Sequence, residues 1–204
     1  MAKMKVNPLF LLLTFTFLFI LGLSFIFSAP PSTKAAADAT LTGYAWSSNI
    51  GWISLSCENE GSNYCDTSDY QVSIDFTSGD FSGYAWSSNI GWIDFDAAGP
   101  YPESPANAAV LIGGVPEAIC ESEREVSGWA RALSPNADGR SGWDGWIKFA
   151  GETTGGAHYG VCLAQNEKSL EGYAWGGDVV GWVQFDPSLN SVLKTTGIRE
   201  EIPR

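Results

Sequence analysis

The chain has 204 residues, the length of one or two domains, and 45% of them are hydrophobic, so a folded core is expected. Asp and Glu number 23 against 11 Lys and Arg, a formal charge of -12. This balance argues against nucleic acid as a partner, because phosphate binding needs clustered basic residues. The single histidine, His158, leaves little material for His-paired nucleophiles or multi-histidine metal sites.

Residues 1–37 have the composition of an export signal. Lys3 and Lys5 precede an almost wholly apolar run from Pro8 to Phe27, and small residues follow it. This order is typical of a secretory signal peptide, with cleavage expected after Ala37. A run of this length also spans a bilayer, so a retained anchor helix stays open as the alternative and as the only membrane contact expected. In both cases the remainder is exported, either secreted or held at the cell surface.

An eleven-residue motif recurs along the exported part. Gly43 to Ile53 reads Gly-Tyr-Ala-Trp-Ser-Ser-Asn-Ile-Gly-Trp-Ile, and Gly83 to Ile93 is identical. An interrupted third copy runs from Gly128 to Phe149, and a fourth runs from Gly172 to Val183. Spacings of 40, 45 and 44 residues between the leading glycines indicate four repeated units. We divide the chain into the segment 1–37, repeats one and two (38–98), a Pro-rich connector (99–106), repeats three and four (107–187) and a polar tail (188–204).

Each unit is predicted to form three antiparallel strands. Gly-Tyr-Ala-Trp and Gly-Trp-Ile are aromatic and β-branched runs on either side of turn-forming residues, which is typical of a hairpin. Upstream, residues 70–76 and 159–163 alternate apolar and polar side chains, as a third strand does. In the third unit, 109–112 or 115–119 fills this place. The first unit has no such strand upstream, and we hypothesise that the tail segment 191–197 supplies it and closes a ring.

The predicted fold class is all-β. Four antiparallel three-stranded meander repeats form a small propeller-like ring or a β-sandwich, preceded by one N-terminal hydrophobic signal or anchor helix. The Pro-rich connector is expected to divide the chain into two halves of two units each. The leading glycines lie within strands, so we expect either an aromatic ring over the bare Cα or a β-bulge at each of them.

Alternation along the strands assigns two faces to each unit. Ile53 and its equivalents Ile93, Ile147 and Val183 share an apolar side, which is the expected core. The opposite side carries the repeated Trp and Tyr residues and accepts Arg131, which can lie flat on a neighbouring Trp, so it reaches water as a semi-exposed aromatic ladder. The candidate ligand-binding residues on this ladder are Trp46, Trp86, Trp143, Trp175, Tyr44, Tyr84 and Arg131.

Four cysteines in an exported chain predict two disulfides. Cys57 and Cys65 flank a short polar loop, and Cys120 and Cys162 each lie just upstream of a repeat core. We therefore favour the pairs Cys57–Cys65 and Cys120–Cys162 among the three possible connectivities. A zinc site is the weaker interpretation, because the sequence contains no Cys-x-x-Cys.

Candidates for metal binding and catalysis are weak. Asn136, Asp138 and Asp144 lie in the long turn of the third copy and form a weak Ca²⁺ candidate, for which an ordinary Asx turn is the stronger interpretation. Asp94 and Asp96 share one strand face at a separation that glycosidases use, but a solvated acidic edge is the favoured interpretation. We expect no enzyme activity, no metal and no cofactor.

The ordered series of motifs from Thr42 to Asp186 resembles a family of exported Gly-Tyr-Ala-Trp/Gly-Trp-Ile repeat proteins of ultra-small candidate-phyla bacteria. The resemblance implies an extracytoplasmic protein, often at the cell surface, and carries over no catalytic or binding residue. The expected function is a non-catalytic surface module that binds a glycan or protein partner through the aromatic ladder. A structural envelope or surface-assembly subunit, with the rings packed between units, is the alternative. A glycan-active enzyme is the second alternative.

Overall fold

The computed structural model describes residues 38–60, 65–111, 119–120, 124–134, 143–164 and 166–194. The predicted signal or anchor segment 1–37 and the tail beyond residue 194 lie outside these ranges. None of the helices in the described ranges has the length and hydrophobicity needed to cross a bilayer.

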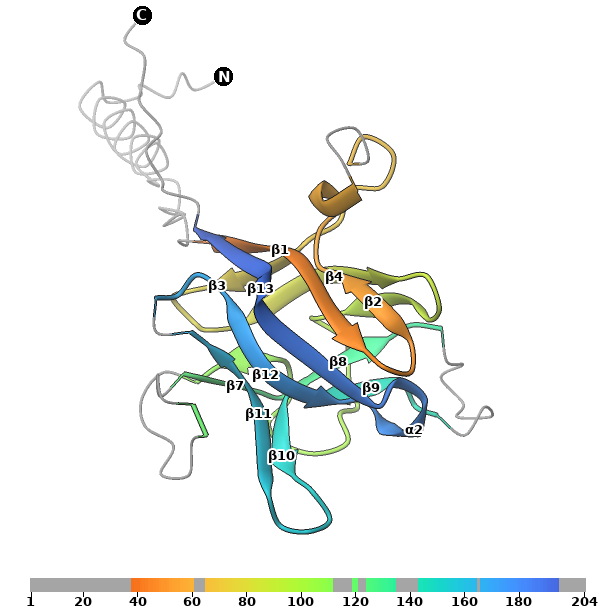
Figure 1. Cartoon of the computed structure of the whole chain (residues 1–204), viewed down its shortest axis with the longest axis vertical. Coiled ribbons are helices and arrows are strands. Elements are labelled where there is room, and N and C mark those ends of the chain that lie inside the picture. Colours follow the sequence, from red (N-terminus) through yellow and green to blue (C-terminus); the bar gives the residue numbers. More distant parts are fainter. Residues whose placement is uncertain are drawn as a thin grey trace, which may run out of the picture. The chain divides into compact units, whose positions relative to one another are not determined.

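Strands dominate the described ranges, which confirms the all-β class (Figure 1). Two short helical segments accompany them, a 3-10 turn at Cys57–Glu60 and α2 at Gly177–Val180. The strands are β1 (Asp38–Ser47), β2 (Gly51–Ser54), β3 (Val72–Asp75), β4 (Phe81–Ser87), β5 (Gly91–Asp94), β6 (Ala109–Val110), β7 (Glu125–Ser127), β8 (Trp129–Ala132), β9 (Trp146–Lys148), β10 (Ala150–Glu152), β11 (His158–Leu163), β12 (Leu170–Trp175) and β13 (Trp182–Lys194).

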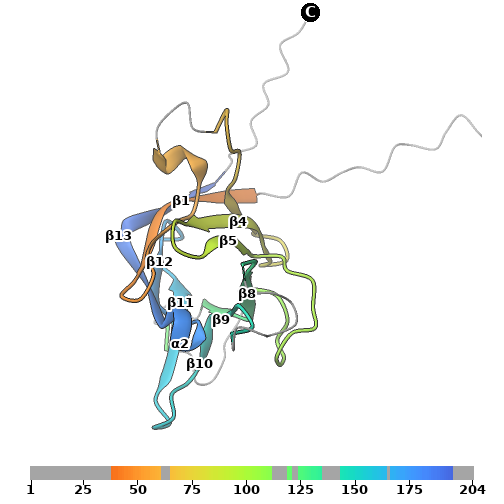
Figure 2. The ribbon, with the colours of Figure 1, turned by 90° about the vertical axis from the view of Figure 1, so that its right-hand side faces the viewer.

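Eight of these strands form one closed antiparallel barrel in the order β13-β1-β2-β4-β5-β8-β9-β12, because β12 pairs back onto β13. The barrel consists of four hairpins, β1–β2, β4–β5, β8–β9 and β12–β13, and each carries one copy of the motif. Figure 2 shows the ring of strands from the side at right angles to Figure 1. The β10–β11 hairpin extends away from the ring in both views.

The predicted propeller-like ring and β-sandwich are both wrong as arrangements. Neighbouring hairpins hydrogen-bond to one another, with Ser54 opposite Trp86 and Ile93 opposite Ala132, so the units share one sheet and do not form separate blades. Because the barrel is closed, each of its eight strands pairs with a neighbour on both sides and the ring has no free edge. The same pairing of β5 with β8 shows that the Pro-rich connector does not separate two halves of the chain.

The third strand of each unit lies outside the ring of eight. β3 pairs with β4, and β11 pairs with β12, both antiparallel as the alternation predicted. In the third unit, the short β6 pairs with β7 and occupies the first of the two predicted places. For the first unit, the far end of β13 pairs with β1, with Ser191 opposite Thr42 and Lys194 opposite Ala39. The tail thus supplies the missing strand, as hypothesised.

The barrel interior is built from equivalent residues of the four hairpins. Each hairpin contributes an Ala from its first strand and a β-branched residue and a larger apolar residue from its second, all buried. Phe149 lies at the centre of these side chains, with its ring 5.6 Å from Phe95 and 6.0 Å from Phe185. The interior residues are Ala45, Ala85, Ala130, Ala174, Ile53, Ile93, Ile147, Val183, Leu55, Phe95, Phe149 and Phe185.

The leading glycine of every motif adopts a left-handed backbone, with φ between +85° and +102°. A Cβ atom at Gly83 would lie 2.1 Å from the carbonyl oxygen of Gln71, and the other three glycines face a backbone carbonyl in the same way. The expected aromatic ring over the bare Cα is therefore wrong. The alternative, a bulge, is present at Gly43, where the β1–β13 register shifts between Gly43 and Ala45.

Polar side chains in and beside the hairpin turns connect neighbouring hairpins. Asn89 donates through Nδ2 to the carbonyl oxygen of Ile50 in the preceding turn at 2.9 Å. Ser134 donates to the carbonyl oxygen of Ile90 at 2.6 Å, and Asn49 donates to that of Asp178 at 3.2 Å. These bonds fix the turns to one another at one end of the barrel.

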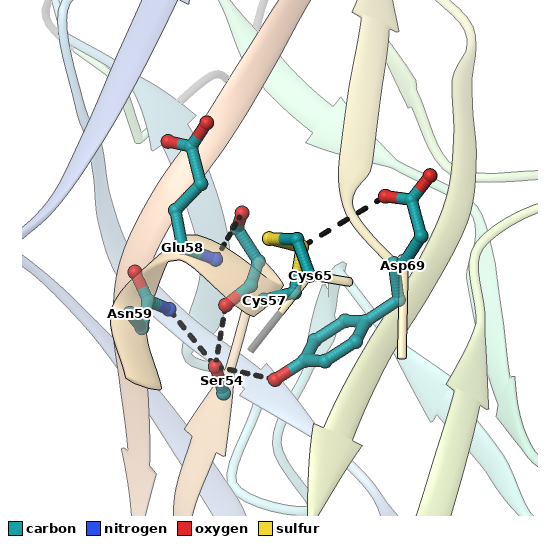
Figure 3. The surroundings of a disulfide bond; sticks show 8 residues. Ser54, Cys57, Glu58, Asn59, Cys65 and Asp69 are labelled. Atoms are coloured by element: carbon teal, nitrogen blue, oxygen red, sulfur yellow. Dashed lines mark hydrogen bonds between the residues drawn. A yellow bond between two sulfur atoms is a disulfide. The ribbon is translucent and has the colours of Figure 1, made fainter. Parts of the chain in front are cut away.

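The structure contains two disulfides, Cys57–Cys65 and Cys120–Cys162, with Cα atoms 5.1 and 5.6 Å apart. These are the two pairs that the sequence favours, and they fit an oxidising compartment. The first closes the excursion between β2 and β3 beside Ser54, whose hydroxyl accepts a hydrogen bond from Asn59 at 2.9 Å (Figure 3).

Candidate functional site: an outer aromatic surface

The outer face of the barrel carries four equivalent side-chain clusters, one on each hairpin. In the first hairpin, Trp46 on β1 lies directly opposite Trp52 on β2, and the equivalent positions of the other hairpins face each other in the same way. Directly opposite side chains on one face of a sheet are in contact. We name the clusters in chain order: cluster 1 (Tyr44, Trp46, Trp52), cluster 2 (Tyr84, Trp86, Trp92), cluster 3 (Trp129, Arg131, Trp146) and cluster 4 (Tyr173, Trp175, Trp182).

The Trp of the second strand is the centre of each cluster. In cluster 1 the ring centroid of Trp52 lies 4.7 Å from that of Trp46 and 5.7 Å from that of Tyr44, in edge-to-face geometry. In cluster 3, Arg131 takes the position of Trp46, and its guanidinium carbon lies 4.9 Å from the centroid of Trp146. Arg131 thus lies on a neighbouring Trp, an arrangement that the sequence allowed at this position.

The four clusters differ strongly in exposure. In cluster 1, Trp52 is 51% exposed and Trp46 is 38% exposed. In cluster 4, Trp182 is 38% exposed. In cluster 3, by contrast, Trp129 is 9% exposed and Trp146 is 6% exposed. The same motif therefore presents an open aromatic surface in one unit and a closed one in another.

The Pro-rich connector closes cluster 3. Tyr101 packs on Trp146 with ring centroids 5.0 Å apart, and its hydroxyl donates to the carbonyl oxygen of Ala97 at 2.5 Å. The indole nitrogen of Trp129 donates to the carbonyl oxygen of Glu103 at 3.1 Å, and the Glu103 carboxylate forms an ion pair with Lys148. The connector is a segment of peptide bound on an aromatic cluster of its own chain.

A tyrosine caps the central Trp in two other clusters as well. The ring centroid of Tyr70 lies 5.1 Å from that of Trp92, and that of Tyr159 lies 4.8 Å from that of Trp182, both edge-to-face. Sequence reasoning missed this role, although Tyr70 and Tyr159 each precede the leading glycine of their unit by 13 residues. That shared spacing was the available signal.

The predicted ladder residues do not all come together. Trp46, Trp86, Trp175, Tyr44 and Tyr84 lie in the outer clusters, with Tyr84 exposed and Trp86 and Trp175 half-buried. Arg131 lies in the closed cluster. The sequence analysis left out Trp52, Trp182 and Tyr173, which are among the most exposed aromatic residues in the described ranges.

Trp143 is not part of the outer surface. It is half-buried and packs against the main hydrophobic core. Its indole lies within 3.9 Å of where a Cβ of Gly177 would be. The interpretation of Trp143 as an exposed ligand-binding ring is therefore incorrect.

The weak Ca²⁺ candidate stays without structural support. Asn136 and Asp138 lie outside the described residues. Asp144 accepts a hydrogen bond from the backbone N–H of Trp146 at 3.2 Å, which is the local bond of an Asx turn. Asp94 likewise accepts one from the backbone N–H of Asp96 at 2.9 Å. Within the described ranges, no three or more His, Cys, Asp or Glu residues gather in a way that could hold a metal ion.

A groove of about 600 Å³ lies between the end of the connector and the β10–β11 hairpin. Glu125, Lys148, His158 and Tyr159 line it. Burial raises the pKa of the Glu125 carboxyl above its ordinary value, and the nearby His158 opposes this rise. The groove is separate from the open cluster 1.

No family model matches the chain, and comparisons with curated proteins and with solved structures gave no match.

Proposed function

We propose that this protein is an exported, non-catalytic binding module that holds a glycan or protein partner on its outer aromatic clusters. The observation that carries the proposal is the exposure of Trp52 and Trp46, 51% and 38%, on a barrel whose core is filled without them. Burying a large apolar side chain stabilises a protein by about 1.5–3 kcal/mol. Because these rings are largely exposed, they contribute little of that stabilisation to the free molecule. Clustered exposed rings are typical of interaction surfaces.

The chemistry of the surface supports this role. Indole and phenol rings offer large, rigid contact area at a small cost in conformational entropy, and they stack on the apolar faces of sugars and on protein side chains. The excess of 23 acidic over 11 basic residues repels polyanions, so neutral or cationic partners are favoured.

The proposed location is the cell surface or the extracellular space. The signal-like segment 1–37 and the two disulfides support export, and the segment, if uncleaved, is the proposed membrane anchor. We also propose membership of the exported repeat family that the motifs resemble, in which surface proteins are common.

A glycan array and titrations followed by tryptophan fluorescence test the binding role on the purified protein. We expect ligand binding that Trp46→Ala and Trp52→Ala abolish, and that Leu193→Ala leaves intact, because Leu193 is equally exposed at 50% but belongs to no cluster. Binding that all three variants retain would contradict the proposal.

The two alternative functions give different results in simple assays. A structural assembly subunit would shield every indole from acrylamide in its native assembly, whereas the binding module leaves cluster 1 open to the quencher. A glycan-active enzyme would turn over a glycan on the array, and Asp94→Asn would reduce that turnover.

A further inference from the structure

In cluster 3 the connector lies on the aromatic rings as an irregular peptide segment with bends. Three kinds of contact hold the connector there. The ring of Tyr101 packs on Trp146, a backbone carbonyl accepts the Trp129 indole N–H, and Ala97, just before the connector, is buried against the two indoles. A peptide with a tyrosine between prolines is therefore an occupant that this type of cluster accommodates.

The capping position can be followed from unit to unit through the strand register. The leading glycine lies opposite Val72 in the second unit, Val161 in the fourth and Asn190 in the first. The residue two positions before this partner is the capping tyrosine in the second and fourth units. The corresponding residues in chain order of the units are Ser188, Tyr70, Ala106 and Tyr159.

The first and third units thus lack a tyrosine at this position. In the third unit, a tyrosine from another segment covers the central Trp. In the third unit, Ala106 occupies the position and Tyr101 reaches Trp146 from the connector. In the first unit, Ser188 occupies it as an exposed residue whose hydroxyl bonds to Asp186 at 2.7 Å. Consistently, Trp52 is the most exposed of the four central tryptophans, whereas Trp146 is buried.

Chain continuity explains the difference. Between β5 and β6, residues 95–108 form an irregular segment that supplies Tyr101 as the cap of cluster 3. Between the fourth and the first unit there is no excursion, because β13 runs without interruption through 13 residues and serves both units. In the first unit the capping position therefore lies within β13, where the chain has Ser188 in place of a tyrosine.

We propose that cluster 1 binds a Pro- and Tyr-containing peptide segment of a partner protein, with the tyrosine ring lying on Trp52 as Tyr101 lies on Trp146. This inference rests on the proposed binding function and names its ligand class. Tyrosine is the cap in the other three clusters, which favours an aromatic peptide side chain over a sugar. Flanking prolines restrict the free peptide and lower the entropy lost on binding.

The acidic residue of the connector is not expected in the ligand of cluster 1. Glu103 pairs with Lys148, and the strand register places Ser54 at the position equivalent to Lys148. With the negative charge of the whole chain, a neutral peptide therefore fits cluster 1 better than an acidic one.

The test uses the full chain and a synthetic peptide with the sequence of residues 98–105 and Gln in place of Glu103. Titration by tryptophan fluorescence and calorimetry is expected to show saturable binding, and replacing the peptide tyrosine by Ser is expected to weaken it about tenfold or more. Trp52→Ala should abolish binding, while the matched variant Leu193→Ala, similarly exposed but in no cluster, should retain it.

A second variant adds the missing cap without removing any ring. Ser188 is exposed, so Ser188→Tyr should preserve the fold, place a tyrosine against Trp52 and weaken peptide binding about tenfold or more. Urea unfolding curves check that each variant is folded.

The outcomes separate this inference from the proposed function. Peptide binding that survives both Trp52→Ala and Ser188→Tyr overturns the inference. If the peptide does not bind but a glycan binds and Trp52→Ala abolishes that binding, the inference of a peptide ligand is wrong and the proposed binding function stands. Absence of any ligand that depends on Trp52 overturns both.

Discussion

Replacing Gly83 by Ala tests why a glycine leads every motif. Gly83 has φ of +85°, and the added Cβ would lie 2.1 Å from the carbonyl oxygen of Gln71. That oxygen also accepts the backbone N–H of Tyr84 at 3.0 Å, so it cannot move away without weakening this bond. The substitution therefore combines backbone strain with a steric clash at a junction between β3 and β4.

The expected cost follows from these contributions. A left-handed backbone costs an L-residue about 1–2 kcal/mol. Loss of the hydrogen bond between Tyr84 and Gln71 costs about 1 kcal/mol, and forcing an atom into a packed site costs about 1–3 kcal/mol. We expect Gly83→Ala to lower the free energy of unfolding by about 4 kcal/mol, a large part of the stability of a small domain.

Gly156→Ala is the matched control, because Gly156 has φ of +80° but no atom within 4 Å of the added Cβ. It should lose only the strain contribution of about 1–2 kcal/mol, and the smaller entropy of the unfolded Ala chain affects both variants equally. Urea unfolding followed by tryptophan fluorescence measures both values. Equal destabilisation of the two variants would refute the steric explanation for the motif glycine.

Two further predictions concern the disulfides and Glu125. The disulfides Cys57–Cys65 and Cys120–Cys162 close loops of 8 and 42 residues. Replacing both cysteines by Ser should lower the free energy of unfolding in urea by about 2.5 kcal/mol for the first disulfide and about 4 kcal/mol for the second, because the longer loop has more entropy to lose. A larger loss for the first disulfide would contradict the loop-entropy explanation. Because burial raises the pKa of Glu125 above 4.5, the folded state disfavours its charged form, and stability present at low pH is lost as pH rises through the folded pKa. Glu125→Gln should then raise stability at pH 7 by about 0.5 kcal/mol, a small gain because partial exposure screens the charge, and should leave it unchanged near pH 4. A destabilised variant at pH 7 would show that the carboxylate is favourably paired.

The hairpins were predictable from the sequence because residue types encode them. Aromatic and β-branched runs around Ser-Ser-Asn specify a hairpin, and alternation put Ile53 and its equivalents in the core, where the structure has them. How the hairpins join was not predictable. Neighbouring hairpins pair through backbone groups, such as those of Ser54 and Trp86, and these groups are the same in every residue type.

The exposure of each cluster could not be inferred from the motif either. Cluster 1 and cluster 3 have related sequences, yet Trp52 is open and Trp146 is buried. The difference arises from Tyr101, which lies in a connector that the sequence marks only as rich in proline. Long-range packing by an irregular segment leaves no periodic pattern, so only the structure places this tyrosine on cluster 3.

Oxidative footprinting of the tryptophans tests the central claim most directly, because it reports the solvent access of each indole in the intact protein. Hydroxyl radicals followed by tandem mass spectrometry should modify Trp52 several times faster than Trp146 and Trp129, which the connector covers. Tyr101→Ala should raise the rates of Trp146 and Trp129 toward that of Trp52. Equal rates in the unmodified sequence, or protection of Trp52, would contradict a barrel with one open and one closed aromatic cluster.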